Sequence, residues 1–81
     1  MIENIIVDCK EGLHASKCSE IVRKANSYES EITLSYNEQK IDLKSILGLL
    51  SLCVNYGEKV TLEFDGKDSK EAFNELKKLF A

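Results

Sequence analysis

The sequence predicts a single α+β domain, residues 1–81, in which helices cover one face of a sheet. Four segments alternate apolar and polar residues, which is typical of strands with one buried face. Three further segments repeat apolar residues at helical spacing, and they fall between and after the strands. Because an amphipathic sheet and amphipathic helices must each bury an apolar side, a two-layer sandwich satisfies both.

The four predicted strands are short, and polar turns separate or close them. The second and third strands flank the turn-like Asn37-Glu38-Gln39, and Asp65-Gly66 closes the fourth. The hairpin between the second and third strands makes at least part of the sheet antiparallel. The apolar positions are, strand by strand, Ile5, Val7 and Cys9; Ile32, Leu34 and Tyr36; Ile41 and Leu43; and Val60, Leu62 and Phe64.

The three predicted helices fill the remaining segments. The second helix, from Ser45 to about Cys53, has more apolar residues than one stripe needs. The third begins at Asp68, which we predict to be its cap, with Glu71 at the third helical position. The first helix has one apolar stripe, formed by Cys18, Ile21, Val22, Ala25 and Tyr28, and the third has another, formed by Ala72, Phe73, Leu76, Leu79 and Phe80.

Charge and composition exclude several classes of partner. The net charge is -3 and no basic run is present, so we expect no nucleic acid partner. The segment 1–8 lacks a basic start and has an interrupted apolar run, so it is neither a signal peptide nor a membrane span, and we expect no membrane insertion. Three cysteines cannot all pair internally, which favours reduced thiols in the cytoplasm.

The chain has one histidine, His14, in the turn between the first strand and the first helix. Backbone N–H groups and the helix dipole make a helix start an anion site. A neutral imidazole has a nucleophilic nitrogen, and a nucleophile beside an anion site suits reversible phosphoryl transfer. A single histidine in a loop is also a common surface residue, so both interpretations stay open at this point.

The stretches Gly12-Leu13-His14-Ala15 and 42–52, at the separation between His14 and Ser45, together resemble the HPr family, the phosphocarriers of the bacterial sugar phosphotransferase system. Gly12-Leu13-His14-Ala15 is similar to the family's active-site motif. The stretch 42–52 resembles its regulatory-serine region, with Ser45 in the place of the serine. Because the turns at Tyr36-Asn37 and Asp65-Gly66 also fall in family places, the resemblance covers essentially the whole chain. It implies an open-faced sandwich, with a four-stranded antiparallel sheet in the order 1-4-2-3 and three helices on one face.

The resemblance also implies a function and a set of partners. Enzyme I, charged by phosphoenolpyruvate, would phosphorylate His14 as the catalytic residue, and the A-domain of an enzyme II sugar permease would accept the group. The helix start at Ala15, Ser16 and Lys17 would bind the phosphoryl oxygens. Such a protein is a transfer intermediary rather than a stand-alone enzyme, and it needs no cofactor.

The active-site stretch departs from the family motif directly after Ala15. The family continues with Arg-Pro-Ala, whereas this chain has Ser16, Lys17 and Cys18. The resemblance implies that this arginine helps to manage charge at the phosphohistidine. Losing such a charge-assisted contact costs about 1.5–3 kcal/mol. If the contact acts in the transition state, its loss slows phosphoryl transfer by roughly 10- to 100-fold. Lys17 either supplies a point charge or points to solvent. We expect Ser16 to cap the helix, with a bond to phosphate as the alternative.

Ser45 has two interpretations of equal weight. It caps the second helix, or it is modified by an HPr kinase/phosphorylase. The apolar residues that follow, Ile46, Leu47 and Leu50, either belong to the core or, as the resemblance implies, form a docking patch for partners. An HPr-like regulatory adaptor, controlled through Ser45 and with transfer lost, is therefore the alternative function.

The three cysteines could join His14 in a metal or redox site. However, Cys9, His14 and Cys18 do not have a recognised zinc spacing, and buried free cysteines usually pack as small apolar residues. We therefore expect structural cysteines and no metal. On the family pattern, Cys53 replaces a glycine at the end of the second helix.

Overall fold

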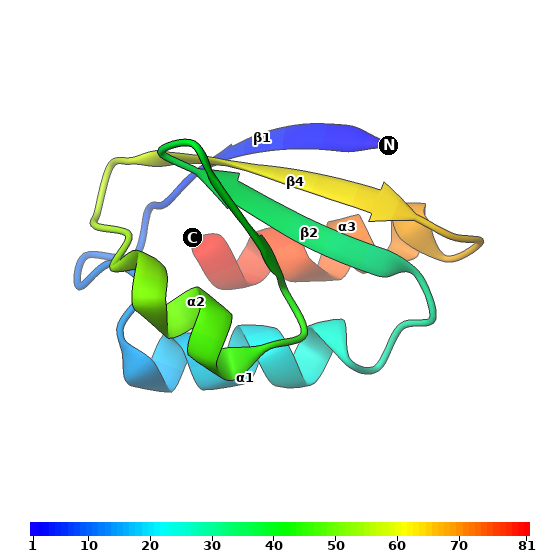
Figure 1. Ribbon diagram of the computed structural model, residues 1–81, viewed down its shortest axis with the longest axis horizontal. Coiled ribbons are helices and arrows are strands. Elements are labelled where there is room, and N and C mark those ends of the chain that lie inside the picture. Colours follow the sequence, from blue (N-terminus) through cyan, green and yellow to red (C-terminus); the bar gives the residue numbers. More distant parts are fainter.

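The computed structural model describes all residues, 1–81, and has the predicted two layers. A four-stranded sheet forms one layer, and the helices pack against one of its faces (Figure 1). The elements in chain order are β1 (Ile2–Ile6), α1 (Ala15–Ala25), β2 (Glu31–Tyr36), β3 (Gln39–Asp42), α2 (Ile46–Leu52), β4 (Lys59–Asp65), α3 (Ser69–Leu76) and the 3₁₀ turn η1 (Lys77–Phe80). No helix is both long and apolar enough to cross a bilayer.

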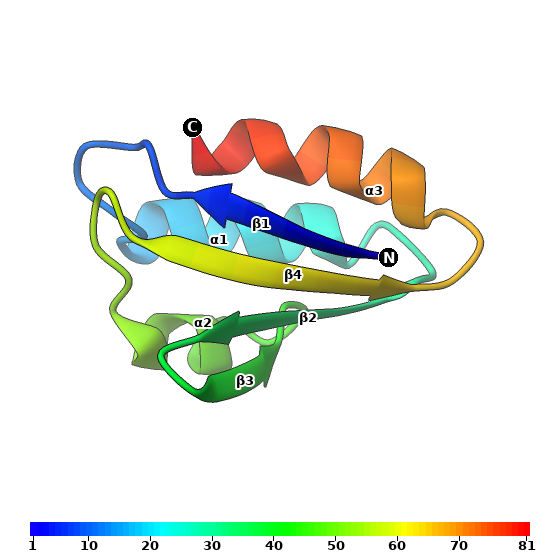
Figure 2. The same cartoon turned by 90° about the horizontal axis from the view of Figure 1, so that it is seen from above.

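The strand order β1-β4-β2-β3 confirms the predicted topology, and every pairing is antiparallel (Figure 2). The β2–β3 hairpin turns through two residues, Asn37 and Glu38, with φ of 52° and 67°. Two positive φ values are those of the tight turn whose twist suits a hairpin. Gln39, which the sequence placed in the turn, is therefore the first residue of β3.

The core lies between the sheet and the helices. The inward positions of β2 and β4 alternate with exposed or half-buried ones, as the sequence pattern predicts. The opposite face of the sheet is uncovered, so Ile2 and Ile6 of β1 are 64% and 55% exposed. The core includes Ile32, Leu34, Val60, Leu62 and Phe64 from the sheet and Cys18, Ile21, Ala25, Leu49, Ala72, Leu76 and Phe80 from the helices and η1.

The first strand is shorter than the sequence pattern suggests. Its partner β4 begins at Lys59, which pairs with Ile6, so the ladder ends there and the predicted strand positions Val7 and Cys9 lie beyond it. The Val7 N–H instead donates to the Glu58 carbonyl at 2.8 Å. Val7 remains fully buried, which explains why alternation alone included it in the strand.

Asp68 occupies the predicted N-cap position of α3, but its carboxylate makes no capping bond to that helix. It accepts hydrogen bonds from the Glu29 and Ser30 amides, at 2.9 and 3.0 Å, and from the Ser30 hydroxyl. These bonds, above all the one from Ser30, hold the pKa of Asp68 below its usual range. Asp68 therefore connects the loop before β2 to the start of α3.

Candidate active site

His14 is exposed and occupies the N-cap position of α1. The first bond of the helix runs from the Cys18 N–H to the His14 carbonyl, at 2.9 Å. The amides of the first three helical residues, Ala15, Ser16 and Lys17, therefore have no helical acceptor, and no side chain caps them. The predicted arrangement of an imidazole beside free amide donors is present.

Glycine at position 12 sets the path of the loop into His14. Gly12 has φ +72°, and a Cβ atom there would lie 2.7 Å from the Val54 carbonyl oxygen. The next residue, Leu13, donates its N–H to the same oxygen at 2.9 Å. The loop before α1 is thus held directly against the segment that follows α2.

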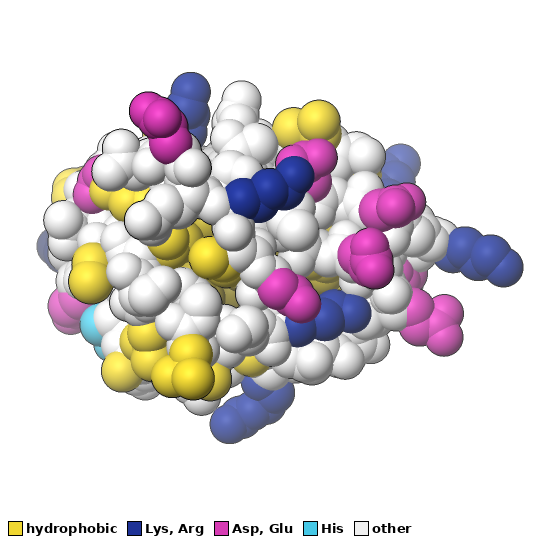
Figure 3. Space-filling view, viewed as in Figure 1, with side chains coloured by type: hydrophobic (Ala, Val, Ile, Leu, Met, Phe, Trp, Pro, Cys, Tyr) yellow, Lys and Arg dark blue, Asp and Glu magenta, His cyan; other side chains and the backbone are white.

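A shallow pocket of about 300 Å³ lies at this junction. It brings the predicted residues His14, Ala15 and Leu50 together with Cys53, but neither Ser16 nor Lys17 lines it. Figure 3 shows the histidine beside hydrophobic side chains that gather over α2. The sequence analysis missed three lining residues, Glu11, Val54 and Asn55, of which Glu11 carries the pocket's one charge.

Of the three residues that replace the family motif, Ser16 and Lys17 take positions different from those expected. Ser16 is the second residue of α1 and its hydroxyl makes no hydrogen bond, so the predicted capping role is wrong. The N-cap is His14, one position before the helix begins. The Lys17 ammonium lies 3.9 Å from a Glu20 carboxylate oxygen, with its side chain 21% exposed.

Two cysteines brace the loop, as the packing interpretation predicts for them. The buried Cys18 thiol donates to the Leu13 carbonyl at 3.3 Å, and the half-buried Cys9 thiol donates to the Gly12 carbonyl at 3.4 Å. Burial, followed by the nearby Cys53 and Cys9, raises the pKa of the Cys18 thiol. Cys53 differs, because it is exposed and ends α2 in the left-handed conformation, with φ 52°. No group of three or more His, Cys, Asp or Glu side chains is placed to hold a metal ion.

Ser45 is exposed and caps α2, since its hydroxyl accepts from the Gly48 N–H at 3.2 Å. The three predicted docking residues differ in burial. Leu47 is 77% exposed, whereas Ile46 and Leu50 are half-buried against the core. Ser45 therefore lies at the N-terminal end of α2, and the apolar patch follows it along the same short helix. Leu50, near the other end of α2, connects the patch to the His14 pocket.

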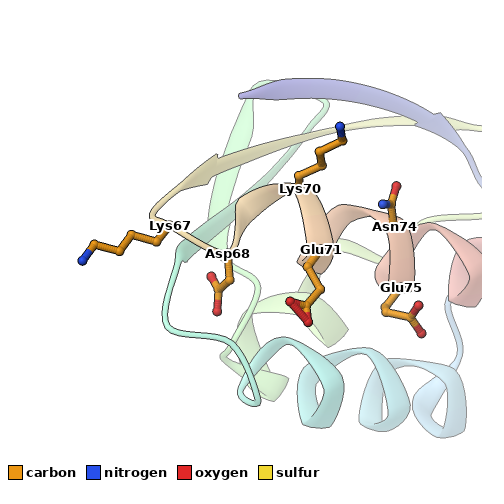
Figure 4. Close-up of a pocket in the computed structure, with 6 residues that line it drawn as sticks. All are labelled: Lys67, Asp68, Lys70, Glu71, Asn74 and Glu75. Atoms are coloured by element: carbon orange, nitrogen blue, oxygen red, sulfur yellow. The ribbon is translucent and has the colours of Figure 1, made fainter.

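A larger hollow, of about 510 Å³, lies along α3 at the other end of the molecule. All six lining residues are polar or charged in type, and the carboxylates of Asp68, Glu71 and Glu75 lie on the side of α3 that faces α1 (Figure 4). The Asp68 carboxylate already binds the loop before β2. The hollow lacks the histidine, and its three carboxylates disfavour an anion at the start of α3, so the site is the smaller pocket.

Comparison with known proteins defines the class. Residues 2–81 match the family model described as the PTS HPr component phosphorylation site. The phosphocarrier protein HPr of Cupriavidus necator is 39% identical over 72 residues, which cover 89% of this chain and 81% of that protein. HPr of Mycoplasma capricolum is 33% identical over the same shares of the two chains. The sequence thus has the features of a phosphocarrier of the phosphotransferase system.

Solved structures agree with this class. The crystal structure of a phosphocarrier protein HPr from Bacillus anthracis superposes with a TM-score of 0.93 at 28% identity, over 98% of this chain and 94% of that one. HPr-C-His from Thermoanaerobacter tengcongensis gives a TM-score of 0.93 at 34% identity, over 99% and 90% of the two chains. The chain belongs to the HPr family, and its function is that of a phosphocarrier.

Proposed function

We propose that His14 is the residue that carries the phosphoryl group, received from enzyme I and passed to the A-domain of an enzyme II sugar permease. The observation that supports this most directly is the exposed imidazole at the N-cap of α1, beside three amides without helical acceptors. A partner can approach His14 from solvent, and the family membership supplies the kind of chemistry. These partners act in the cytoplasm, where we place the protein.

The geometry suits a reversible transfer. A His14 ring nitrogen attacks phosphorus and forms a P–N bond while the bond between phosphorus and the donor breaks, and the reverse displacement gives the group to the acceptor. During this exchange the amides of Ala15, Ser16 and Lys17 donate to the phosphoryl oxygens, and the positive end of the α1 dipole favours their charge. No cofactor takes part in this scheme.

The site has less positive charge than the family motif provides, because Ser16 stands in the place of the arginine. The pocket around His14 contains Glu11 but no basic side chain. Lys17 is the nearest candidate, and its long pairing of 3.9 Å with the exposed Glu20 is of a kind that contributes only about 0–1 kcal/mol. A phosphoryl group could therefore attract Lys17 away from Glu20. We expect a functional but slow carrier.

Transfer of the phosphoryl group from His14 to an A-domain distinguishes the carrier function from the adaptor function. The family matches favour the carrier. His14 phosphorylated by enzyme I should lose its phosphate to a purified A-domain in a chase, as followed by intact mass spectrometry. A phosphate that stays on the chain when an ordinary HPr is emptied in the same assay would favour the adaptor.

We further propose that Leu47, Ile46 and Leu50 dock partners and that phosphorylation of Ser45 controls this docking. A phosphate on Ser45 would sit at the positive end of α2, where its charge is favourable, so we expect little unfolding. Its main effect would fall on the neighbouring patch.

Incubation with a bifunctional HPr kinase/phosphorylase should add one phosphate to the wild type and none to Ser45→Ala. Ser51→Ala is the matched control, because Ser51 is an exposed serine on the same helix, and it should be labelled like the wild type. If the wild type stays unmodified while an ordinary HPr in the same tube is labelled, Ser45 is not a kinase site.

A further inference from the structure

We propose that Tyr36 and Glu58 are positioning residues for phosphoryl transfer, because they hold the loop that forms one wall of the His14 pocket. This inference rests on the proposed role of His14. Tyr36 is the last residue of β2, and Glu58 directly precedes β4. Neither residue lines the pocket itself.

Glu58 is bonded through its side chain and its backbone. One carboxylate oxygen accepts from the Tyr36 hydroxyl, and the other accepts from the Asn55 N–H at 3.0 Å. Its backbone carbonyl accepts from the Val7 N–H at 2.8 Å, and its own N–H donates to the Asn55 carbonyl at 3.3 Å. One half-buried residue thus joins the end of β2, the loop after α2 and the loop after β1.

The loop that Glu58 holds is in direct contact with the active-site loop. Val54 and Asn55 line the pocket together with His14. The Val54 carbonyl accepts from the Leu13 N–H at 2.9 Å, and the close approach of this oxygen is what requires glycine at position 12. A displacement of Val54 would therefore move the residue directly before His14.

The segment 53–58 is otherwise held by the buried Val54 side chain and by a bond from the Gly57 N–H to the Val7 carbonyl at 2.8 Å, so Glu58 fixes the Asn55 part of its path. It forms no helix or strand, and it leaves α2 through Cys53 in the left-handed conformation. The bonds from Tyr36 and Asn55 also keep the pKa of Glu58 below its usual range, so the carboxylate is ionised near neutral pH and accepts at both oxygens. Because transfer rates depend steeply on the alignment of the reacting atoms, a looser loop should slow the reaction.

The test compares single variants with enzyme I and phosphoenolpyruvate under single-turnover conditions. We expect Glu58→Ala to lower the phosphorylation rate at saturating enzyme I by about tenfold, with little change in the enzyme I concentration that gives half the maximal rate. Glu58→Gln should recover most of this loss, since its amide oxygen still accepts from the Asn55 N–H. Tyr36→Phe, which removes one hydroxyl, should lie between the two.

Glu63→Gln is the matched control. Glu63 is also an acidic residue, on β4, and it pairs with Lys40 at 3.0 Å on the uncovered face of the sheet. This variant should transfer like the wild type. Amide and ring resonances of Leu13 and His14 should shift in Glu58→Ala and Tyr36→Phe but not in Glu63→Gln. If Glu58→Ala does not fold, Tyr36→Phe alone gives the answer.

The two proposals fail in different ways. Wild-type rates in both Tyr36→Phe and Glu58→Ala, or an equal loss in Glu63→Gln, would overturn the positioning role and leave His14 as the carrier. A wild-type chain that enzyme I does not label would overturn the role of His14 and this inference with it.

Discussion

At the scale of single residues, Cys53 is one of three non-glycine residues with a positive φ, and the one that ends a helix. It has φ 52° and ψ 49°, and a side chain in this conformation costs about 1–2 kcal/mol. Glycine would remove that cost but add about 0.4–1 kcal/mol of unfolded-state entropy. Cys53→Gly should therefore raise the free energy of unfolding by roughly 0.5–1 kcal/mol, as measured by urea denaturation.

The control for this prediction is Ser51→Gly, two residues earlier and inside α2. There glycine should lower the free energy of unfolding by about 0.5 kcal/mol, since the backbone is helical. Two glycine variants with the same sign of effect would show that the conformation of Cys53 carries no cost.

Ser16 is the residue whose replacement of the family arginine weakens the site. It is exposed at the start of α1 and its hydroxyl makes no hydrogen bond, so an arginine can be accommodated there. Ser16→Arg should accelerate phosphorylation of His14 by roughly 10- to 100-fold, as measured by the rate of labelling with enzyme I.

Ser19→Arg adds the same charge to an exposed position one turn further along α1 and should have little effect. Equal rates in Ser16→Arg and the wild type would indicate that Lys17, or a partner, already supplies the charge. Equal acceleration in both variants would point to long-range attraction instead of a contact with phosphate.

At the scale of elements, Asp68 links the loop before β2 to the start of α3 through three hydrogen bonds. Because the folded chain lowers the pKa of this carboxyl, its contribution to stability is present above the unfolded pKa. That contribution is lost as the pH falls through the lower, folded pKa. Urea denaturation at a series of acidic pH values should show a steeper loss for the wild type than for Asp68→Asn.

The folded chain also lowers the pKa of Glu58, so protonation of Glu58 in acid reduces the stability of the fold in the same direction as protonation of Asp68. Asp68→Asn retains Glu58, so the difference between the two curves isolates Asp68. Parallel curves would contradict the structural account of Asp68.

Val7, Leu43 and Asp68 show why the sequence predicts the presence of helices and strands better than the residues at which they begin and end. Periodicity in the sequence reports which side chains face the core, and Val7 and Leu43 are fully buried although they lie beyond β1 and β3. A strand ends where its partner ends, which a local pattern does not contain. Asp68 has the residue type of a cap, yet its partners come from a loop far away in the sequence.

At the scale of the whole molecule, the candidate site was predictable in part. His14, Gly12 and the start of α1 lie on one continuous stretch, so their chemistry could be inferred from order and spacing. The other wall of the pocket comes from Val54 and Asn55, which tertiary packing brings against that stretch. Val54 and Asn55 are ordinary in type and pattern, and nothing in the local sequence distinguishes them.

The central claim is that His14 carries the phosphoryl group, and intact mass measurement after incubation with enzyme I and phosphoenolpyruvate tests it most directly. The account predicts that the wild type gains one acid-labile, base-stable phosphate and that His14→Ala gains none. An ordinary HPr in the same tube shows that the donor is active. A wild-type chain that stays unlabelled with several enzyme I proteins, including one from the same source, while the ordinary HPr is charged, would contradict the account.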